Sequence, residues 1–160
     1  MTHEPKLRIT GEVVQPRELS FDELAAVASE FQLIDVSRID SKRQGDAVTL
    51  VGLLTLVGAK PMSKYLGLHA ATDNFHASIP LEPVLQRAFV IYRLDGQPLS
   101  VKNGGPFRFF IPDFAACHTH EIDECANVKF VDHMELTADI GFDNRPHDGD
   151  EHAALHERQT

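Results

Sequence analysis

The stretch NGGPFRFF, residues 103–110, is a candidate for binding chemistry because it places an arginine directly after a tight turn. Gly104 and Gly105 allow the backbone to turn sharply or to approach an anionic ligand closely. The flanking phenylalanines alternate along a predicted strand, so Arg108 points to the opposite face. An arginine held on a rigid strand can grip a phosphate through two parallel hydrogen bonds. A structural salt bridge to one of the chain's many carboxylates is the alternative interpretation.

A second group of chemically useful side chains lies in CHTHEIDEC, residues 117–125. Thiol and imidazole groups are the ligands that zinc, copper and nickel prefer, and the C-x-x-H spacing lets two of them converge on one ion. A divalent transition-metal site is therefore one interpretation, with Cys117, His120 and Cys125 as its ligands. A pair of ordinary buried cysteines and a disulfide are the two alternatives.

The elements that must position these side chains are short. Ser20 and Glu23 form a capping box, which predicts that a helix begins there. Apolar residues at positions 50, 53, 54 and 57 share one helical face, and Gly58 predicts the end of that helix. Strands are predicted in FQLIDV, YLGLH, FVIYRL, PFRFFIP and NVKFVDHMEL. Many short strands with a few short helices indicate an α+β fold.

Length and charge limit the classes of function. A chain of 160 residues fits one domain with its own core. The net charge of −9 argues against nucleic acid or an anionic membrane as partner, since such partners are normally met by a basic surface. No apolar run approaches the roughly 18 residues that a membrane span needs, and the first residues lack the apolar core of a signal peptide. We therefore expect a cytoplasmic protein, and its oligomeric state stays open.

The chain divides into a folded part and a tail. Residues 1–142 carry the predicted helices and strands and are expected to form one domain. Residues 143–160, DNRPHDGDEHAALHERQT, are rich in acidic residues and histidines and are expected to be exposed or flexible.

Four segments occur in an order that resembles one family. They are LRITGEVVQPRELSFDEL, then LLTLVGAKPMSKYLGLHAATDNFHASIPL, then LDGQPLSVKNGGPFRFFIPD, then CANVKFVDHMEL. This run is similar to the oxidoreductase molybdopterin-binding domain of the sulfite oxidase family, over residues 7 to about 137. Each motif alone is weak, but four in this order and spacing are fairly specific. The resemblance implies a sulfite-oxidase-like molybdopterin-binding fold with the molybdenum cofactor as ligand.

The resemblance also assigns cofactor contacts, one residue at a time. Arg108 and Lys129 match the family's G-G-P-x-R and V-K motifs and are expected to hold the pterin phosphate, although a strand lysine can also be an ordinary solvated charge. Asp73 and Phe75 match a D-G-Y segment, in which Asn74 replaces the glycine and can take the same left-handed conformation. The expected cofactor-binding residues are Ser37, Asp73, Phe75, Asn103, Gly104, Gly105, Arg108 and Lys129.

One departure from the family pattern concerns the metal. Family members ligate molybdenum through a cysteine thiolate at the end of an early strand, and the matching segment here, FQLIDVSRID, contains no cysteine. Asp35, Val36 or Ser37 takes that place, whereas sulfite oxidase chemistry uses the soft thiolate donor. Two functions therefore stay open. One is a small molybdopterin-dependent oxidoreductase, and the other is a non-catalytic protein that binds a small anion, a metal ion or a protein partner on the same fold.

Overall fold

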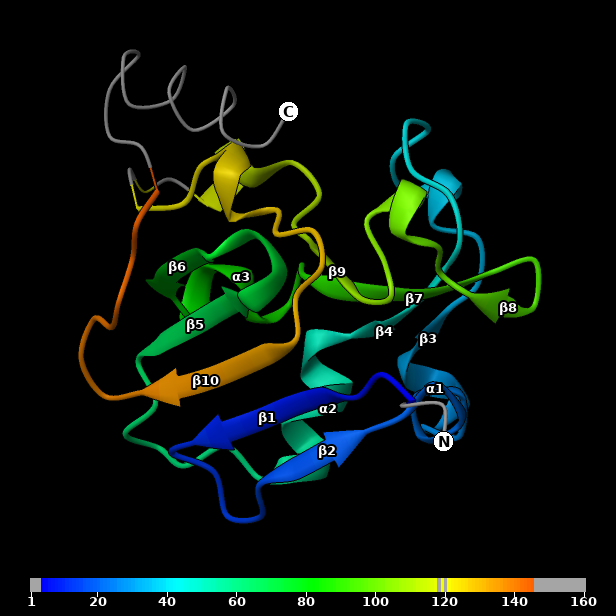
Figure 1. Ribbon diagram of the computed structural model, residues 1–160. Helices are drawn as coiled ribbons and strands as arrows, with labels where there is room; N and C mark the ends of the chain where they lie inside the picture. Colours follow the sequence, from blue (N-terminus) through cyan, green and yellow to red (C-terminus); the bar gives the residue numbers. More distant parts are fainter. Residues whose placement is uncertain (1–3, 118, 120, 146–160) are drawn as a thin grey trace.

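A computed structural model of the chain describes residues 4–117, 119 and 121–145. This part of the chain forms two β-sheets of five strands each, together with three short α-helices (Figure 1). The predicted α+β class is therefore confirmed. None of the helices in these ranges is long and apolar enough to cross a membrane.

The first sheet has the strand order β2-β1-β10-β5-β6. β1 and β10 run parallel, and the other neighbours are antiparallel. Arg8 near the start of the chain pairs in register with His133, so the two ends of the domain meet in the middle of this sheet. The strands are β1 (Leu7–Gly11), β2 (Arg17–Leu19), β5 (Tyr65–Ala70), β6 (Phe75–Pro80) and β10 (His133–Thr137).

The second sheet has the order β3-β4-β7-β8, and β9 pairs with β7. All of its pairings are antiparallel. The loop between β3 and β4 and the turn before β9 lie side by side at one end of this sheet (Figure 1). The strands are β3 (Gln32–Leu33), β4 (Asp46–Thr49), β7 (Phe89–Leu94), β8 (Gln97–Pro98) and β9 (Arg108–Phe110).

Two helices begin where their local signals predict, and one of them ends at its predicted glycine. Ser20 and Glu23 form both hydrogen bonds of the capping box at the start of α1 (Phe21–Ala25). Thr49 caps α2 (Leu50–Val57), and Gly58 ends it in the left-handed conformation with φ +72°. α3 (Glu82–Leu85) is a single turn, and the 3-10 turns are η1 (Ser29–Phe31), η2 (Val36–Arg38), η3 (Ala71–Asp73), η4 (Val101–Asn103), η5 (Phe114–Cys117) and η6 (Glu124–Ala126).

Two apolar clusters stabilise the fold. The main core combines buried side chains of the first sheet, of α2 and of one face of the second sheet, with Phe109 among them. A smaller cluster contains Phe110 from β9 and Val36 from the loop after β3. Because neighbouring residues of a strand point to opposite faces, these clusters cover the two faces of the second sheet. Burial of such side chains contributes roughly 1.5–3 kcal/mol each to stability, before the entropy of ordering is subtracted.

Three predicted strands are shorter than their apolar patterns suggest, and in PFRFFIP only Arg108–Phe110 is a strand. In NVKFVDHMEL, residues 127–136, only the last four residues join the sheet, as the start of β10, because Phe130 takes a positive φ of 57° that breaks the extended backbone. In FQLIDV only Gln32–Leu33 is a strand, and Asp35 with φ 64° turns the chain away. A left-handed residue ends a ladder even where the side-chain pattern would continue it.

Candidate anion-binding site

The turn before β9 brings its backbone close to neighbouring segments through two glycines. Gly104 has φ +90°, and its carbonyl accepts a hydrogen bond of 2.8 Å from the Phe130 amide. Gly105 donates to the Ser100 carbonyl at 2.8 Å, and a Cβ atom there would lie 2.0 Å from the Leu99 carbonyl oxygen. Only glycine therefore fits Gly105, and Gly104 takes a conformation that glycine adopts without strain.

Arg108 points away from the main core, as the alternation of its neighbours predicts. Phe107 and Phe109 are 2% and 0% exposed, whereas Arg108 is half-buried on the other face of β9. Its Nη1 donates to the Asn103 carbonyl at 3.2 Å. Its Nε is buried and has no hydrogen-bond partner among the described residues. Burial and then the nearby Arg43 charge lower the pKa of Arg108.

Two further cations lie next to Arg108. A Cβ atom on Gly104 would lie 3.0 Å from Cδ of Arg108 and 3.3 Å from Cγ of Lys129, so both side chains pack on this glycine. Arg43, from the loop after β3, places its guanidinium 5.1 Å from the centre of the Phe110 ring. Its Nε is also buried without a partner in the described part of the chain. We call Arg43, Arg108 and Lys129 the cationic cluster.

Carboxylates in the described ranges do not neutralise this cluster. The ion pairs found there join other residues: Asp35 with Arg38, Asp46 with Arg93, Glu135 with His69, and Arg145 with Asp123 and Asp143. A half-buried guanidinium beside a second one, with no counter-ion, carries a desolvation and repulsion cost that a bound anion would offset. The cluster therefore has the charge, the free donors and the close backbone that suit a phosphate.

The other residues expected in the site differ in how well their positions suit ligand binding. Asn103 is exposed next to Gly104, and its amide donates to Ser100 Oγ at 3.0 Å. Asp73 is half-buried in η3, and Asn74 takes the left-handed conformation expected of it, with φ 49°. Phe75 is 8% exposed and belongs to the main core. The structure thus groups Gly104, Arg108 and Lys129 closely and gives Phe75 a packing role.

Residues 35–37, which the resemblance placed where the family has its metal-ligating cysteine, form a small polar turn. The Ser37 hydroxyl donates to Asp35 Oδ1, and the Ser37 amide donates to the same oxygen at 3.2 Å. Arg38 lies 3.8 Å from the other oxygen of Asp35. The oxygen donors at residues 35–37 are thus already engaged with one another.

The predicted transition-metal site falls partly outside the described residues, because His120 is not among them. Cys117 is half-buried, and its thiol lies 3.6 Å from the Pro83 carbonyl. Burial raises the pKa of Cys117 and of Cys125, and the two do not form a disulfide. Within residues 4–117, 119 and 121–145, no three His, Cys, Asp or Glu side chains are placed to hold a metal ion.

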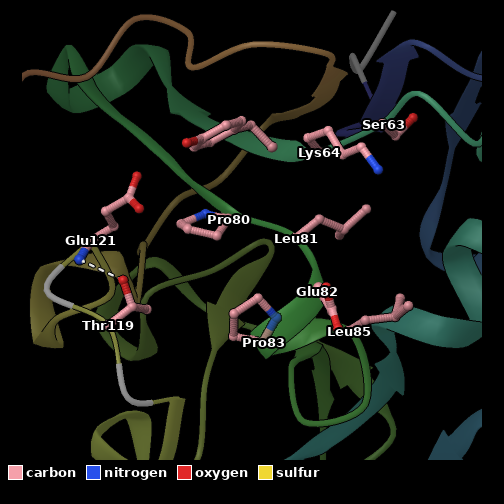
Figure 2. Close-up of a pocket in the computed structure, with 10 residues that line it drawn as sticks. Ser63, Lys64, Pro80, Leu81, Glu82, Pro83, Leu85, Thr119 and Glu121 are labelled. Atoms are coloured by element: carbon pink, nitrogen blue, oxygen red, sulfur yellow. Dashed lines mark hydrogen bonds between the residues drawn. The ribbon is translucent and has the colours of Figure 1, made fainter.

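A separate groove of about 500 Å³ lies between the start of β5, the end of β6 and α3 (Figure 2). Its floor is largely apolar, with Pro80, Leu81 and Pro83. Tyr65 and Glu121 lie at one end, where the Glu121 charge and then burial raise the pKa of the Tyr65 phenol. None of the three members of the cationic cluster lines this groove.

A family of known proteins has the same sequence pattern. The model described as the oxidoreductase molybdopterin binding domain matches residues 2–139. This chain belongs to that family. The expected resemblance is thus confirmed, and the matched range includes all three members of the cationic cluster.

Comparison with solved structures supports the same fold for this molybdopterin-binding domain. The sulfane dehydrogenase SoxCD from Paracoccus pantotrophus is similar, with a TM-score of 0.61 and 19% identical residues. The match covers 85% of this chain and 39% of that chain, so the domain spans less than half of its structural neighbour. Among curated proteins, no match is found. The predicted sulfite-oxidase-like fold is confirmed.

Two groups of residues were not among the expected site residues, although the basic loop that contains Arg43 could also have been interpreted as a phosphate contact. Arg43 lies in a polar loop whose sequence is typical of a solvated basic segment. Its stacking on Phe110, which only the structure shows, distinguishes it from the other basic residues of that loop. The histidines at 69, 76 and 133 come together on the outer face of the first sheet, with ring centres 5.0 and 5.1 Å apart. Their register positions on β5, β6 and β10 are the only signal that could have predicted this, and it requires the strand pairing to be known.

Proposed function

We propose that this domain binds the phosphate of a molybdopterin cofactor at the cationic cluster and does not carry out thiolate-dependent molybdenum catalysis. Membership in the family supports the cofactor class. The single observation that carries the proposal is the pair of buried guanidinium nitrogens, Arg43 Nε and Arg108 Nε, that have no partner in the described part of the chain. Buried donors of this kind are rare in folded proteins and are met by ordered water, an ion or a ligand; Arg17 Nε on β2 is a third in the described residues, but only Arg43 and Arg108 lie together.

The residues present fit the phosphate group. Arg108 and Arg43 offer planar donor sets that match phosphate oxygens, and Lys129 adds a flexible point charge. Gly104, which lacks a Cβ, leaves the space against which Arg108 and Lys129 pack. Here the protein binds and orients the anion, and the folded scaffold holds the donors in place before the ligand arrives, which lowers the entropy cost of binding.

The residues present do not fit the family's metal ligation. When bound, the molybdenum cofactor supplies two-electron redox chemistry, and sulfite oxidase relatives tune it with a soft thiolate. Residues 35–37 supply only oxygen donors, and Asp35 and Ser37 are hydrogen-bonded to each other. We therefore favour a binding role over a sulfite-oxidase type of catalysis for this chain.

The test uses the fluorescent oxidised derivative of molybdopterin, with and without its phosphate, and inorganic phosphate as a third probe. Fluorescence titration and thermal shift are measured on the wild-type chain and on Arg108→Ala, Arg43→Ala and Lys129→Ala. The matched control is Lys102→Ala, an exposed lysine in η4 beside the site. We expect the wild-type chain and the control to bind the phosphorylated pterin, and the three cluster variants to lose this binding.

Other outcomes separate the alternatives. Equal affinity for inorganic phosphate and for the phosphorylated pterin would mean that the ligand is a simple anion and not the pterin. Binding that survives all three cluster substitutions would overturn the site. Near-stoichiometric molybdenum in freshly purified protein, measured by plasma mass spectrometry together with turnover of an oxyanion substrate, would overturn the non-catalytic part of the proposal.

A further inference from the structure

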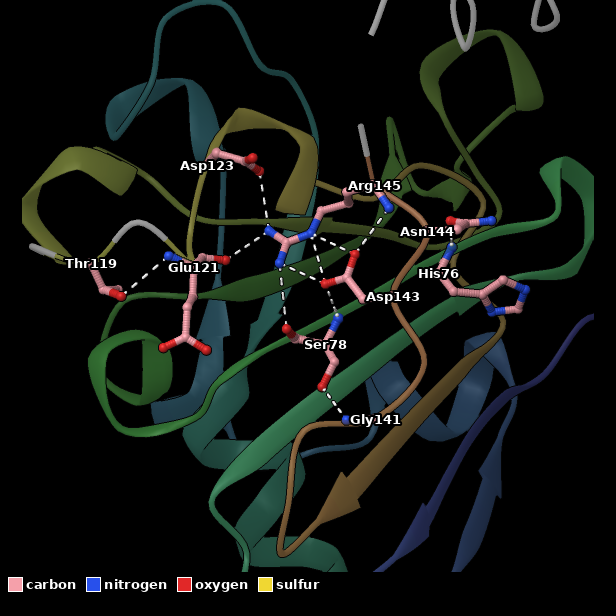
Figure 3. Close-up of polar contacts among 9 residues, drawn as sticks. All are labelled: His76, Ser78, Thr119, Glu121, Asp123, Gly141, Asp143, Asn144 and Arg145. Atoms are coloured by element: carbon pink, nitrogen blue, oxygen red, sulfur yellow. Dashed lines mark hydrogen bonds and ion pairs between the residues drawn. The ribbon is translucent and has the colours of Figure 1, made fainter. Parts of the chain in front are cut away.

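The segment that follows β10 crosses the outer edge of the first sheet and is fastened to β6. We call residues 141–145 the strap. The His76 amide donates to Asn144 Oδ1 at 2.8 Å, and the Asn144 amide donates to the His76 carbonyl at 2.9 Å. Two residues further on, the Ser78 amide donates to Asp143 Oδ2 at 2.9 Å (Figure 3). β6 is the edge strand of its sheet, so the strap satisfies groups that an unprotected edge would expose.

The strap has an anchor that does not titrate near neutral pH. Arg145 is 7% exposed and lies 2.6 Å from Asp143 Oδ2 and 3.2 Å from Asp123 Oδ1. It also donates to the Glu121 carbonyl at 2.7 Å and to the Ser78 carbonyl at 3.4 Å (Figure 3). Guanidinium stays charged throughout the usual pH range. Hydrogen bonds from Arg145 help to hold the pKa of Asp143 below its usual value, against the opposing effect of burial.

The other end of the strap rests on a histidine pair. The ring of Phe142 lies 4.7 Å from the ring of His76, measured between centres. His76 Nδ1 lies 2.8 Å from His69 Nδ1, and His69 Nε2 lies 3.1 Å from Glu135 Oε1. Phe142 therefore contacts the His76 ring, and Asn144 is bonded to the His76 backbone; the Asn144 side-chain amide also donates to the Asn74 carbonyl at 2.8 Å.

The hydrogen bonds of His69 and His76 limit how many protons the two rings can carry together. His69 Nε2 must carry a proton to donate to Glu135, and one proton is shared between the two Nδ1 atoms. His76 Nε2, 3.2 Å from Asn74 Oδ1, carries a third proton when it donates. The contact between His76 Nε2 and Asn74 survives the loss of that proton, because the exposed Asn74 amide can turn and donate to Nε2 instead. A fourth proton would place two N–H groups face to face across 2.8 Å, which breaks the contact.

We propose that the His69–His76 pair is a proton-sensitive support for the strap: acidification separates the two rings, frees Phe142 from the His76 ring and weakens the bonds between His76 and Asn144, while Arg145 and Asp143 stay attached. Glu135 holds His69 in place, so His76 is the ring that moves. His76 lies on the edge strand, and its ring contacts Phe142, which is 61% exposed and can give way when the ring moves. This inference does not depend on the ligand of the cationic cluster.

The charged groups around the pair agree with release at mildly acidic pH. Burial and then the His69 charge lower the pKa of His76, and Asp132, before β10, opposes this. On the neighbouring strands, His133 and Glu135 of β10 and Arg8 of β1 face the same region, with Arg8 and His69 both disfavouring a charge on His133. From the strap itself, Asp143 is neutralised by Arg145. The charged form of His76 is therefore disfavoured until the pH falls below about 6.5, the ordinary pKa of histidine.

Amide hydrogen exchange followed by NMR tests the proposal on the full chain. Exchange is compared at about pH 7.5 and about pH 5, after correction for the intrinsic rate. Protection of the His76 and Asn144 amides should fall by about tenfold for each pH unit below the last protonation, since one proton is taken up on opening. The Ser78 amide, bonded to the anchored Asp143, should keep its protection, as should the amides of β5.

Variants identify the responsible groups. His76→Gln and His69→Gln each remove the facing pair and should abolish the pH step. His133→Gln is the matched control, because its Nε2 pairs with Thr10 of β1 at 2.5 Å and not with the strap. If near-ultraviolet circular dichroism shows that His76→Gln folds poorly, His69→Gln alone tests whether the histidine pair causes the pH step. A pH step that persists in both pair variants, or equal protection at the two pH values in the wild type, would overturn the proposal.

Discussion

Arg43, from the β3–β4 loop, and Arg108, from β9, are two half-buried cations that approach each other without a counter-ion among the described residues. Burial and then the Arg43 charge disfavour the charged form of Arg108 and lower its pKa. Such an arrangement costs stability in the free protein. A bound anion reverses this cost, so ligand binding and stability are linked at this site.

Replacing Arg108 by alanine should change the free energy of unfolding little, or raise it, because a desolvated and unpaired charge is removed. The comparison is Arg93→Ala, since Arg93 lies 2.9 Å from Asp46 and its loss leaves that carboxylate without its partner. Urea denaturation should show a loss of about 1–3 kcal/mol for Arg93→Ala only. A loss of similar size in Arg108→Ala would mean that Arg108 is a structural residue and not a ligand-binding one.

Gly104→Ala should separate backbone strain from ligand binding. Its φ of +90° strains any other residue, and the new Cβ would press on Arg108 and Lys129. Gly96 has a similar φ of +79° with nothing within 4 Å, so Gly96→Ala is the strain control. Both should lose about 1–2 kcal/mol in denaturation, and only Gly104→Ala should lose affinity for the phosphorylated pterin. Equal affinity in the two variants would place the ligand elsewhere.

Removing the buried charge at Arg145 should strongly destabilise the fold. Arg145→Met leaves Asp143, whose side chain is 11% exposed, without its partner and should cost about 3–5 kcal/mol. The double variant Asp143→Asn with Arg145→Met should recover part of this loss, since the unpaired charge is then absent. Chemical denaturation of the two single variants and the double variant measures the coupling; strictly additive losses would contradict it.

The stability of the whole domain should fall as the solution becomes mildly acidic. Burial, then Arg8 and His69, lower the pKa of His133 below the value of an unfolded histidine. Between the two values the unfolded chain binds more protons, so the free energy of unfolding declines as pH falls through about 6.5 and levels off below the folded pKa. Urea denaturation from about pH 8 to about pH 5 checks this, and His133→Gln should flatten the decline. An unchanged slope in that variant would assign the effect to other groups.

Local signals in the sequence determined the parts of the structure whose interactions are short-range. The capping box at Ser20 and the Thr49 to Gly58 span gave helices where predicted, because each bond joins residues within one or two turns. The alternation around Arg108 correctly predicted its direction, since the strand period is a property of the backbone. The order of four motifs was enough to predict the family and the fold that the comparisons confirm.

Tertiary structure alone decided which distant residues meet. Arg43 joins Arg108 only because the β3–β4 loop and β9 lie at the same end of one sheet, and the histidine pair exists only through the β5–β6 register that sets His69 opposite His76. Left-handed backbone at Phe130 delayed the start of one predicted strand, and at Asp35 it ended another, although the apolar pattern around each residue predicted a continuous strand. The physical reason is the same in each case: pairing register and loop closure depend on the whole core, so no local pattern encodes them.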